Sequence, residues 1–300
     1  MKKAITITAF LLLLSWNAFS QTSKLDSLLT LLPQATDEVR ISLLHEIVKA
    51  AWTTEPDQVI GYAREAIALS QDSENLELLS TSYRILGGLY NYMSQIDSGK
   101  YYKQQALIIA LKLQNPNLLA SSYNNLGVTS QTLGNYVEAL EYFYRAYLIS
   151  KSIPNYNGLP IVLANISEVY YDLNEYDSAT RYAHMAVEIT SSQPNTSRHL
   201  LTLNALARPT LANAEFTVAN SLYSTIIIIS AEIGDKRYSA YASQGLGKLN
   251  AAQNFPITAR SHYNNALALF TELDDQAYLA ELYTDLGRLN VDSRPDSSLH

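Results

Sequence analysis

The fold is decided by Ser121 to Ile149, which reads SSYNNLGVTSQTLGNYVEALEYFYRAYLI. Its apolar spacing predicts two amphipathic helices joined at Leu133-Gly134-Asn135. The landmarks of this stretch return every 40 residues: Leu86, Leu126, Ile166, Leu206, Leu246 and Leu286 form one column, and Ala66, Ala106, Ala146, Ala186 and Ala266 form another, with Ile226 as its exception. Self-similarity at a fixed period predicts stacked repeats rather than one globular core.

A small residue follows each recurring leucine or isoleucine. Glycine inside a helix costs about 1 kcal/mol relative to alanine, so its repeated use indicates a close contact with a partner helix. The second helix of the repeat carries a small column, Ala139, Ala179, Ala219 and Ala259, followed in most copies by Phe143, Tyr223 and Tyr263. We therefore expect small residues of one helix to receive large side chains of the next. The small column of the first helix reads Gly87, Gly127, Ser167, Ala207, Gly247 and Gly287.

Turn-forming residues separate the repeats at the same period. They are Asn75, Asn115, Asn155, Asn195, Asp235 and Asp275. Asn and Asp side chains accept hydrogen bonds from free amides at a helix start or shape the turn before it. Pro116, Pro154 and Pro194 stand beside three of them and keep consecutive helices from merging.

Tyr123-x-x-Leu126-Gly127, followed by Ala139, Phe143 and Ala146, resembles the tetratricopeptide repeat, a helix-turn-helix unit. The resemblance implies an all-α solenoid, a right-handed superhelix of antiparallel helix pairs. We expect a capping segment at 21–36, six repeats over 37–275, a terminal half-repeat at 276–290 and a disordered tail at 291–300. The repeats are six residues longer than the common 34-residue form, and such long repeats resemble those of peptide-sensing bacterial regulators and cargo-binding scaffolds.

The fifth repeat departs from the pattern. Pro209 falls inside its first helix, where the missing amide predicts a kink, and Ile226 replaces the small alanine of the second helix. Two interpretations remain open, a bend in the solenoid and neutral drift of the repeat.

The chain begins with Lys2 and Lys3, an apolar run from Ala4 to Leu14 and small residues at Ala18 and Ser20. These are the parts of a secretory signal peptide, with cleavage expected between Ser20 and Gln21. An uncleaved membrane anchor is the alternative, but the run is shorter than the roughly 20 residues that span a bilayer. We predict an exported protein, periplasmic or secreted, whose mature chain has no membrane span.

Composition limits the partners and the chemistry. Residues 1–20 hold two lysines and no acid, so their removal moves the formal net charge from −7 to −9, which disfavours nucleic acid as a ligand. The histidines, His45, His184, His199, His262 and His300, show no metal-ligand spacing, and no nucleophile elbow or phosphate-binding glycine loop occurs. We therefore expect no enzyme activity, no catalytic residue, no metal and no cofactor.

The resemblance also suggests where a ligand binds. In the tetratricopeptide family, residues that flank the Leu-Gly pair of the first helix face a concave groove and contact a peptide or a helix. Carried onto this chain, these positions predict a ligand-binding set of Asn124, Asn125, Asn165, Glu168, Asn204, Arg208, Gln244, Lys248, Asp285 and Arg288.

Three cations of that set, Arg208, Lys248 and Arg288, are spaced 40 residues apart in an acidic protein. Such a ladder would attract an acidic peptide or a free carboxylate, while the asparagines pair to its backbone. The alternative interpretation is three solvated surface charges.

Three functions remain open at this point. The first is a non-catalytic exported scaffold that binds a peptide or protein segment in its groove. The second is a sensor or input domain, since the export signal and long repeats resemble the sensor half of bacterial tetratricopeptide sensor histidine kinases, although no kinase motif is present and no kinase activity is implied. The third, an enzyme, has no motif in its favour.

Overall fold

A computed structural model describes residues 25–52, 55–154 and 156–292 of the chain. The predicted signal peptide at 1–20 and most of the predicted tail lie outside the described residues. The chain divides into two compact units, residues 1–154 and 155–300, each of which is considered by itself. The described residues are almost entirely helical and contain no strand.

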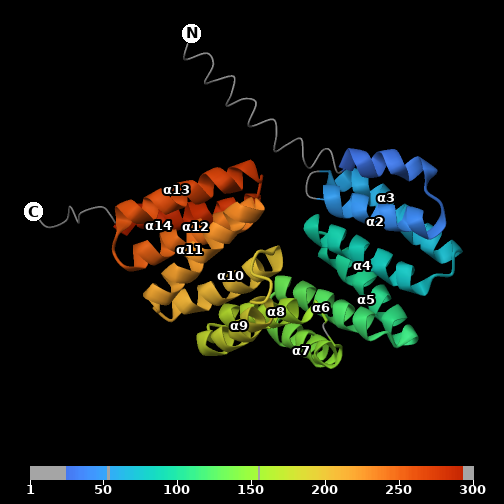
Figure 1. Cartoon of the computed structure of the whole chain (residues 1–300), viewed down its shortest axis with the longest axis horizontal. Helices are drawn as coiled ribbons and strands as arrows, with labels where there is room; N and C mark the ends of the chain where they lie inside the picture. Colours follow the sequence, from blue (N-terminus) through green and yellow to red (C-terminus); the bar gives the residue numbers. More distant parts are fainter. Residues whose placement is uncertain (1–24, 53–54, 155, 293–300) are drawn as a thin grey trace, which may run out of the picture. The chain divides into compact units, whose positions relative to one another are not determined.

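The first unit is built from three helix pairs (Figure 1). They are α2 (Asp37–Ala51) with α3 (Pro56–Asp72), α4 (Leu76–Tyr92) with α5 (Ile96–Leu113), and α6 (Pro116–Thr132) with α7 (Tyr136–Ser152). A helix at 25–31 and the 3₁₀ helix η1 (Leu32–Gln34) precede them. Leu25, Leu28, Leu29 and Leu32 pack against Ile41 and Leu44 of α2 and Ala66 of α3, which covers one end of the first pair.

The second unit holds three pairs and one further helix (Figure 1). The pairs are α8 (Leu159–Asp172) with α9 (Tyr176–Thr190), α10 (Ser197–Ala212) with α11 (Phe216–Ile233), and α12 (Lys236–Ala252) with α13 (Pro256–Glu272); the further helix is α14 (Gln276–Asp292). The last helix ends at Asp292, two residues beyond the half-repeat that the pattern predicts.

Within each unit the first helices of neighbouring pairs contact one another. α2 contacts α4 and α4 contacts α6 in the first unit, while α8, α10, α12 and α14 follow in the same order in the second. Within a unit, each second helix packs against the first helix of its own pair and against the first helix that follows it in that unit. The first helices therefore form one face of each unit, as the tetratricopeptide resemblance implies.

The predicted pairing of small and large residues is confirmed at Gly127 and Gly247, whereas a Cβ at Gly287 would meet nothing within 4 Å. A Cβ added at Gly127 would lie 2.6 Å from the Phe143 ring, and one at Gly247 would lie 2.4 Å from the Tyr263 ring. In the second repeat the same place is taken by Lys103, whose Cγ would lie 2.8 Å from a Cβ at Gly87. These glycines are required because a large side chain occupies the space of their missing Cβ.

Lys103 is therefore a lysine in an aromatic column of the core. Lys103 is only 3% exposed, and its ammonium donates a hydrogen bond to Thr129 Oγ1 of α6 at 2.7 Å. Burial lowers the pKa of Lys103 from 10.5 to about 8, because a charged amine loses its hydration in the core. No carboxylate forms an ion pair with Lys103 among the described residues.

The helix starts follow the predicted capping residues with one difference. The side chain of Asn75 accepts from the Leu78 amide, and that of Asn115 from the amides of Asn117 and Leu118. Asp235 accepts from Tyr238 N, and Asp275 from Tyr278 N. At the start of α10 the cap is Thr196 rather than its neighbour Asn195. Asn155 lies outside the described residues.

The helix ends show a regularity of their own. Left-handed residues occur at Glu74, Ser94, Gln114, Gly134, Asn174, Ala214, Gly234, Asn254 and Asp274, a spacing of 20 residues wherever the series is unbroken. This conformation ends a helix and lets the chain reverse. The two gaps in the series fall at Pro154 and Pro194, where the proline ring fixes φ at a negative value. The first of these gaps coincides with the boundary between the units.

α10 runs through Pro209 as one helix from Ser197 to Ala212. Because proline has no amide hydrogen, the carbonyl of Ala205 lacks its helical donor. The hydroxyl of Ser167 on α8 donates to this carbonyl at 3.4 Å as well as to the carbonyl of Ala179 at 2.8 Å. A side chain of the preceding repeat thus accommodates the irregularity.

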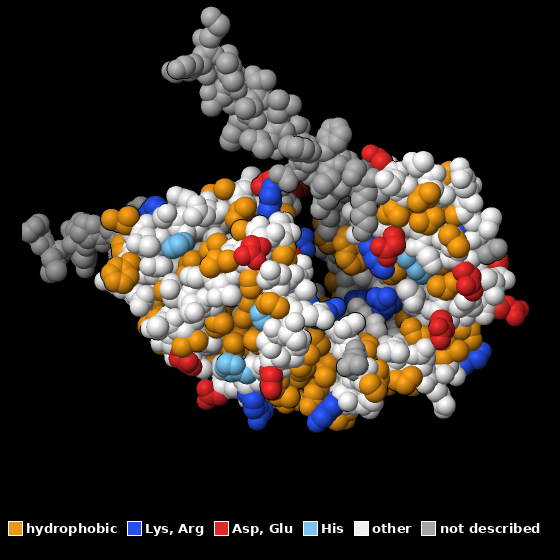
Figure 2. Space-filling model, in the orientation of Figure 1, with side chains coloured by type: hydrophobic (Ala, Val, Ile, Leu, Met, Phe, Trp, Pro, Cys, Tyr) orange, Lys and Arg blue, Asp and Glu red, His pale blue; other side chains and the backbone are white. Residues whose placement is uncertain are grey.

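Apolar side chains also reach the surface of both units. Ile108, Leu148 and Ile228 of the second helices are more than half exposed, and Figure 2 shows apolar side chains interspersed with polar ones on the visible face. Single exposed apolar residues are normal on proteins and indicate no site by themselves.

Of the helices in the described residues, α11 alone is long and apolar enough to cross a membrane by length and composition. It packs between α10 and α12, and its Tyr223, Ile226 and Ile229 are buried there.

Candidate functional site

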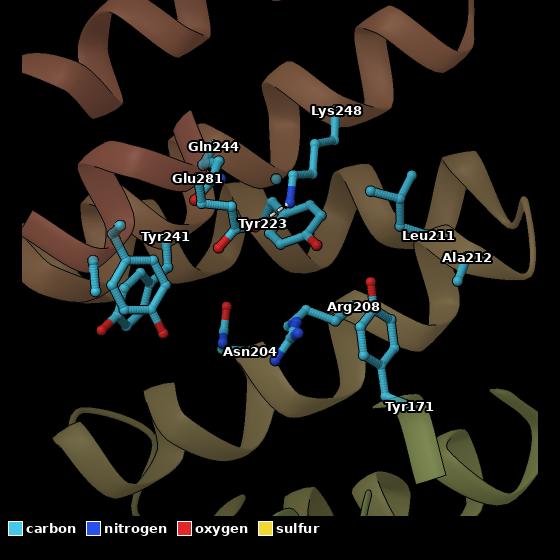
Figure 3. A pocket seen from close by; sticks show the side chains of 13 residues that line it. Tyr171, Asn204, Arg208, Leu211, Ala212, Tyr223, Tyr241, Gln244, Lys248 and Glu281 are labelled. Atoms are coloured by element: carbon cyan, nitrogen blue, oxygen red, sulfur yellow. Dashed lines mark hydrogen bonds and ion pairs between the residues drawn. The ribbon is translucent and has the colours of Figure 1, made fainter. Parts of the chain in front are cut away.

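Residues mainly of the first helices of the second unit line a partly open cavity of about 390 Å³. Figure 3 shows side chains from α8, α10, α11 and α12 directed toward it. α14 supplies the rest of the wall. The lining residues are Tyr171, Asn204, Arg208, Leu211, Ala212, Tyr223, Tyr241, Gln244, Gly245, Lys248, Ala277, Tyr278 and Glu281.

Gly245 explains why Tyr223 can line this cavity. A Cβ at Gly245 would lie 2.3 Å from the Tyr223 ring, so the ring rests directly on the backbone of α12. The residues at the 40-residue spacing from Gly245 are Ile85, Asn125, Asn165, Ala205 and Asp285. All of them carry a Cβ, for which this contact leaves no room. With Tyr223 held against α12, the space between α10 and α12 stays open.

Arg208 projects from α10 between two partners. Its guanidinium pairs with the Glu168 carboxylate of α8, and it lies 4.3 Å from the centroid of the Tyr171 ring, a cation–π contact. Burial alone would lower the pKa of Arg208, but the Glu168 carboxylate raises it, so the guanidinium stays charged. Burial raises the pKa of Glu168, and the charge of Arg208 opposes that effect.

Lys248 on α12 is paired in the same way. Its ammonium lies 2.6 Å from Glu281 Oε1 and 3.5 Å from Asp285 Oδ2, both on α14. Gln244 donates from Nε2 to the same Asp285 oxygen at 2.8 Å. The carboxylate of Asp285 is therefore held by two side chains of α12, and it ties α14 to α12.

Tyrosine rings form the remaining wall. The rings of Tyr241 and Tyr278 lie 4.5 Å apart between centroids. Burial raises the pKa of Tyr223 and of Tyr241, and the neighbouring Tyr278 adds to the effect at Tyr241. These phenols are neutral near pH 7, so they offer aromatic faces and hydroxyl groups rather than charge.

The structure brings part of the predicted set together. Asn204, Arg208, Gln244 and Lys248 line the cavity, and Glu168 reaches it through its pair with Arg208. Lys248, Asp285 and Arg288 line a second cavity of about 440 Å³ beside α14, together with Tyr263 and Asn254.

The other predicted residues do not line either cavity. Asn124 and Asn125 are on α6 of the first unit, where the Asn125 amide donates to the Ser121 carbonyl at 2.7 Å. Asn165 is on α8 but does not line either cavity. Ligand binding by all ten residues stays a prediction.

Sequence reasoning missed the aromatic part of this cavity. Tyr171, Tyr223, Tyr241 and Tyr278 fall outside the columns that flank the Leu-Gly pair, and tyrosines at such positions are usually core residues. The available signal was Gly245, the glycine of a column whose other members, Ile85, Asn125, Asn165, Ala205 and Asp285, all have a side chain. No group of three or more His, Cys, Asp or Glu that could hold a metal ion occurs among the described residues.

The fold and repeats define the class of protein, a helical repeat protein of the tetratricopeptide type. Residues 118–192 match the sequence model of the tetratricopeptide repeat family. This match covers most of α6 to α9, including Ser121 to Ile149. No curated protein sequence matches the chain.

Solved structures with this fold are similar over most of the chain. A Rap protein complexed with Competence and Sporulation Factor is 16% identical over 89% of this chain and 79% of its own, with a TM-score of 0.63. The apo form of RapI is 20% identical over 79% and 92%, with a TM-score of 0.57. BtubC (BKLC) from P. vanneervenii is 17% identical over 75% and 91%, also at 0.57. Identities this low establish the shared fold alone.

Proposed function

We propose that the chain is a non-catalytic scaffold that binds an extended peptide or protein segment along the first helices of its second unit. The observation that carries the proposal is the partly open cavity between α10 and α12. It is lined by tyrosine rings, by the side-chain amides of Asn204 and Gln244, and by the paired charges of Arg208 and Lys248. Concave sites of this size with a few convergent polar groups are the usual form of ligand pockets. The Rap structure in complex with Competence and Sporulation Factor supports the same use of the fold.

The structure bears on the acidic ligand that the cationic ladder predicts. Arg208 and Lys248, two steps of the predicted cationic ladder, are already paired with Glu168 and Glu281. An acidic ligand would have to compete with these carboxylates. Arg288 has no carboxylate partner in the described part of the chain, so an acidic ligand would gain most there.

Peptide selection on the purified mature chain tests the proposal. A displayed random peptide library would be selected on residues 21–300, and the recovered peptides would be measured by calorimetry. We expect Asn204→Ala to weaken binding by about 1 kcal/mol or more, because a side-chain amide that pairs to a peptide backbone is lost. The matched control is Asn264→Ala on the exposed part of α13, which should leave binding unchanged. Peptides that bind both variants as tightly as the unchanged chain would place the site elsewhere.

We also propose that the protein is exported, on the basis of the basic start and apolar run of residues 1–20. N-terminal sequencing of the protein from the host's exported fraction should begin at Gln21; a chain that begins at Met1 would contradict cleavage. A sensor or input domain of a signalling system stays the alternative function. It predicts that disrupting the chain changes the phosphorylation of a response regulator, whereas a scaffold would change only the recovery of its partner.

A further inference from the structure

We propose that the cavity between α10 and α12 binds one aromatic side chain of a peptide, with Asn204 pairing to the peptide backbone beside it. This inference rests on the proposed function, because it names the ligand chemistry of the same site. It differs from the acidic ligand that the cationic ladder predicts.

Charge matching inside the cavity argues against an acidic side chain as its occupant. Each of the two cations that line it has a carboxylate within ion-pair distance, Arg208 with Glu168 and Lys248 with Glu281. A buried ligand carboxylate would need an unpaired cation to offset its lost hydration. Neither wall cation is available without leaving a protein carboxylate unpaired.

The shape and chemistry of the wall instead suit a ring. Four tyrosines, Tyr171, Tyr223, Tyr241 and Tyr278, contribute their rings to a cavity of about 390 Å³. Aromatic pairs at ring distances of about 4.5–7 Å add about 0.5–1.5 kcal/mol beyond the burial of their area. The guanidinium of Arg208 already has Tyr171 on one face, and a ligand ring on its other face would extend the stack.

Gly245 sets the depth of the cavity, and Asn204 offers a polar contact to the peptide backbone. Gly245 lets Tyr223 rest on the α12 backbone, so a larger residue there would push the ring into the cavity. Asn204 lines the same wall, and its half-buried side-chain amide has no hydrogen-bond partner among the described residues. An amide can both donate and accept, which matches one peptide unit of a bound chain.

Capped single amino acids test the inference directly. N-acetyl-L-tryptophanamide, N-acetyl-L-leucinamide and N-acetyl-L-glutamic acid α-amide would be titrated into residues 21–300 and followed by NMR. All three offer the same two peptide units, so they differ only in the side chain. We expect the tryptophan probe to bind about fivefold or more tighter than the leucine probe, as ring stacking contributes beyond area, and the glutamate probe to bind weakest.

A variant that fills the cavity should block binding of the tryptophan probe. Ala277 is an exposed alanine on the cavity wall, so Ala277→Trp places an indole in the cavity with little change to the core. We expect it to abolish tryptophan-probe binding. The matched control is Ala268→Trp on the exposed part of α13, away from both cavities, which should bind as the unchanged chain does. Thermal melts of both variants establish that they are folded.

The outcomes separate this inference from the proposed function. A glutamate probe that binds tightest, or a tryptophan probe that binds Ala277→Trp as well as the unchanged chain, overturns the aromatic assignment. If library peptides are still recovered and still lose affinity with Asn204→Ala, the proposed function stands without it. If no peptide binds the chain, the proposed function fails first.

Discussion

The substitution Lys103→Met tests whether the buried ammonium of Lys103 destabilises the first unit. Methionine keeps the unbranched stem that fills the place of an aromatic ring over Gly87, and it removes the buried ammonium. Thr129 Oγ1 remains satisfied, since it accepts from Asn91 Nδ2 at 3.0 Å and donates to the Asn125 carbonyl at 3.1 Å.

The magnitude follows from the pKa of the amine. A folded-state pKa near 8 against 10.5 in the unfolded chain costs the fold about 3 kcal/mol at pH 7, at 1.36 kcal/mol for each tenfold change. The lost hydrogen bond to Thr129 subtracts about 1 kcal/mol. We therefore expect Lys103→Met to raise the free energy of unfolding of the first unit by roughly 2 kcal/mol at pH 7.

The sign of the pH dependence provides a second readout. The unfolded chain binds the Lys103 proton more tightly, so the lysine destabilises the fold below its unfolded pKa and the effect is complete below pH 8. The advantage of the variant should therefore shrink by about 1 kcal/mol between pH 7 and pH 9.

Urea unfolding followed by tryptophan fluorescence measures both quantities. Residues 21–300 contain one tryptophan, Trp52, which packs against the core of the first unit, so the signal reports on that unit. Lys100→Met is the control, because Lys100 belongs to the same helix but pairs with Glu138 at 3.4 Å on a part-exposed surface. That change should cost about 0–1 kcal/mol without the same pH dependence. Destabilisation by Lys103→Met at pH 7 would refute the account of a buried, unpaired charge.

Two further predictions concern the first unit. His45 lies 2.8 Å from Ser82 Oγ, and its burial lowers its pKa from 6.5 to about 4, so the folded form resists protonation and stability falls as the pH drops below 6.5. Between pH 7 and pH 5 the unchanged chain should lose about 2 kcal/mol more than His45→Gln, measured by urea unfolding at each pH; equal losses would show that His45 is not the group responsible. Gly127→Ala should destabilise the unit by about 1–3 kcal/mol because the Cβ meets the Phe143 ring, whereas Gly61→Ala, with nothing within 4 Å, should stabilise it by up to about 1 kcal/mol. Thermal melts that show the same shift for both glycines would contradict the packing account.

Much of the fold could be predicted from the sequence because the same residue types recur at the same positions of each 40-residue repeat. The columns at Gly127 and Phe143 report a contact inside one helix pair, and that contact is local enough to be read from spacing. The turns were less visible. Gly134 and Gly234 indicate left-handed residues, but Glu74 and Gln114 adopt the same conformation without any composition signal, since the surrounding helices force it.

The cavity was predictable only in part. The flanking-column rule places Asn204, Arg208, Gln244 and Lys248 on one face, and all four line the cavity. The rule could not supply their partners. Glu281 reaches Lys248 from 33 positions away, which depends on how α14 lies against α12. Tyr223 comes from a second helix and reaches the cavity only because Gly245 is small.

The left-handed turns have a consequence for how such a chain can change in length. Where the series is unbroken these turns lie 20 residues apart, and each reversal exchanges the row of first helices for the row of second helices. Removing one helix of the second unit with its turn would therefore transpose every later helix of that unit from one row to the other and direct cavity side chains to the wrong side. Removing a pair of helices with both turns would preserve the row of each remaining helix. The unit of tolerated gain or loss is therefore the whole 40-residue pair, and a ligand site built on first helices persists only in chains that change by that step.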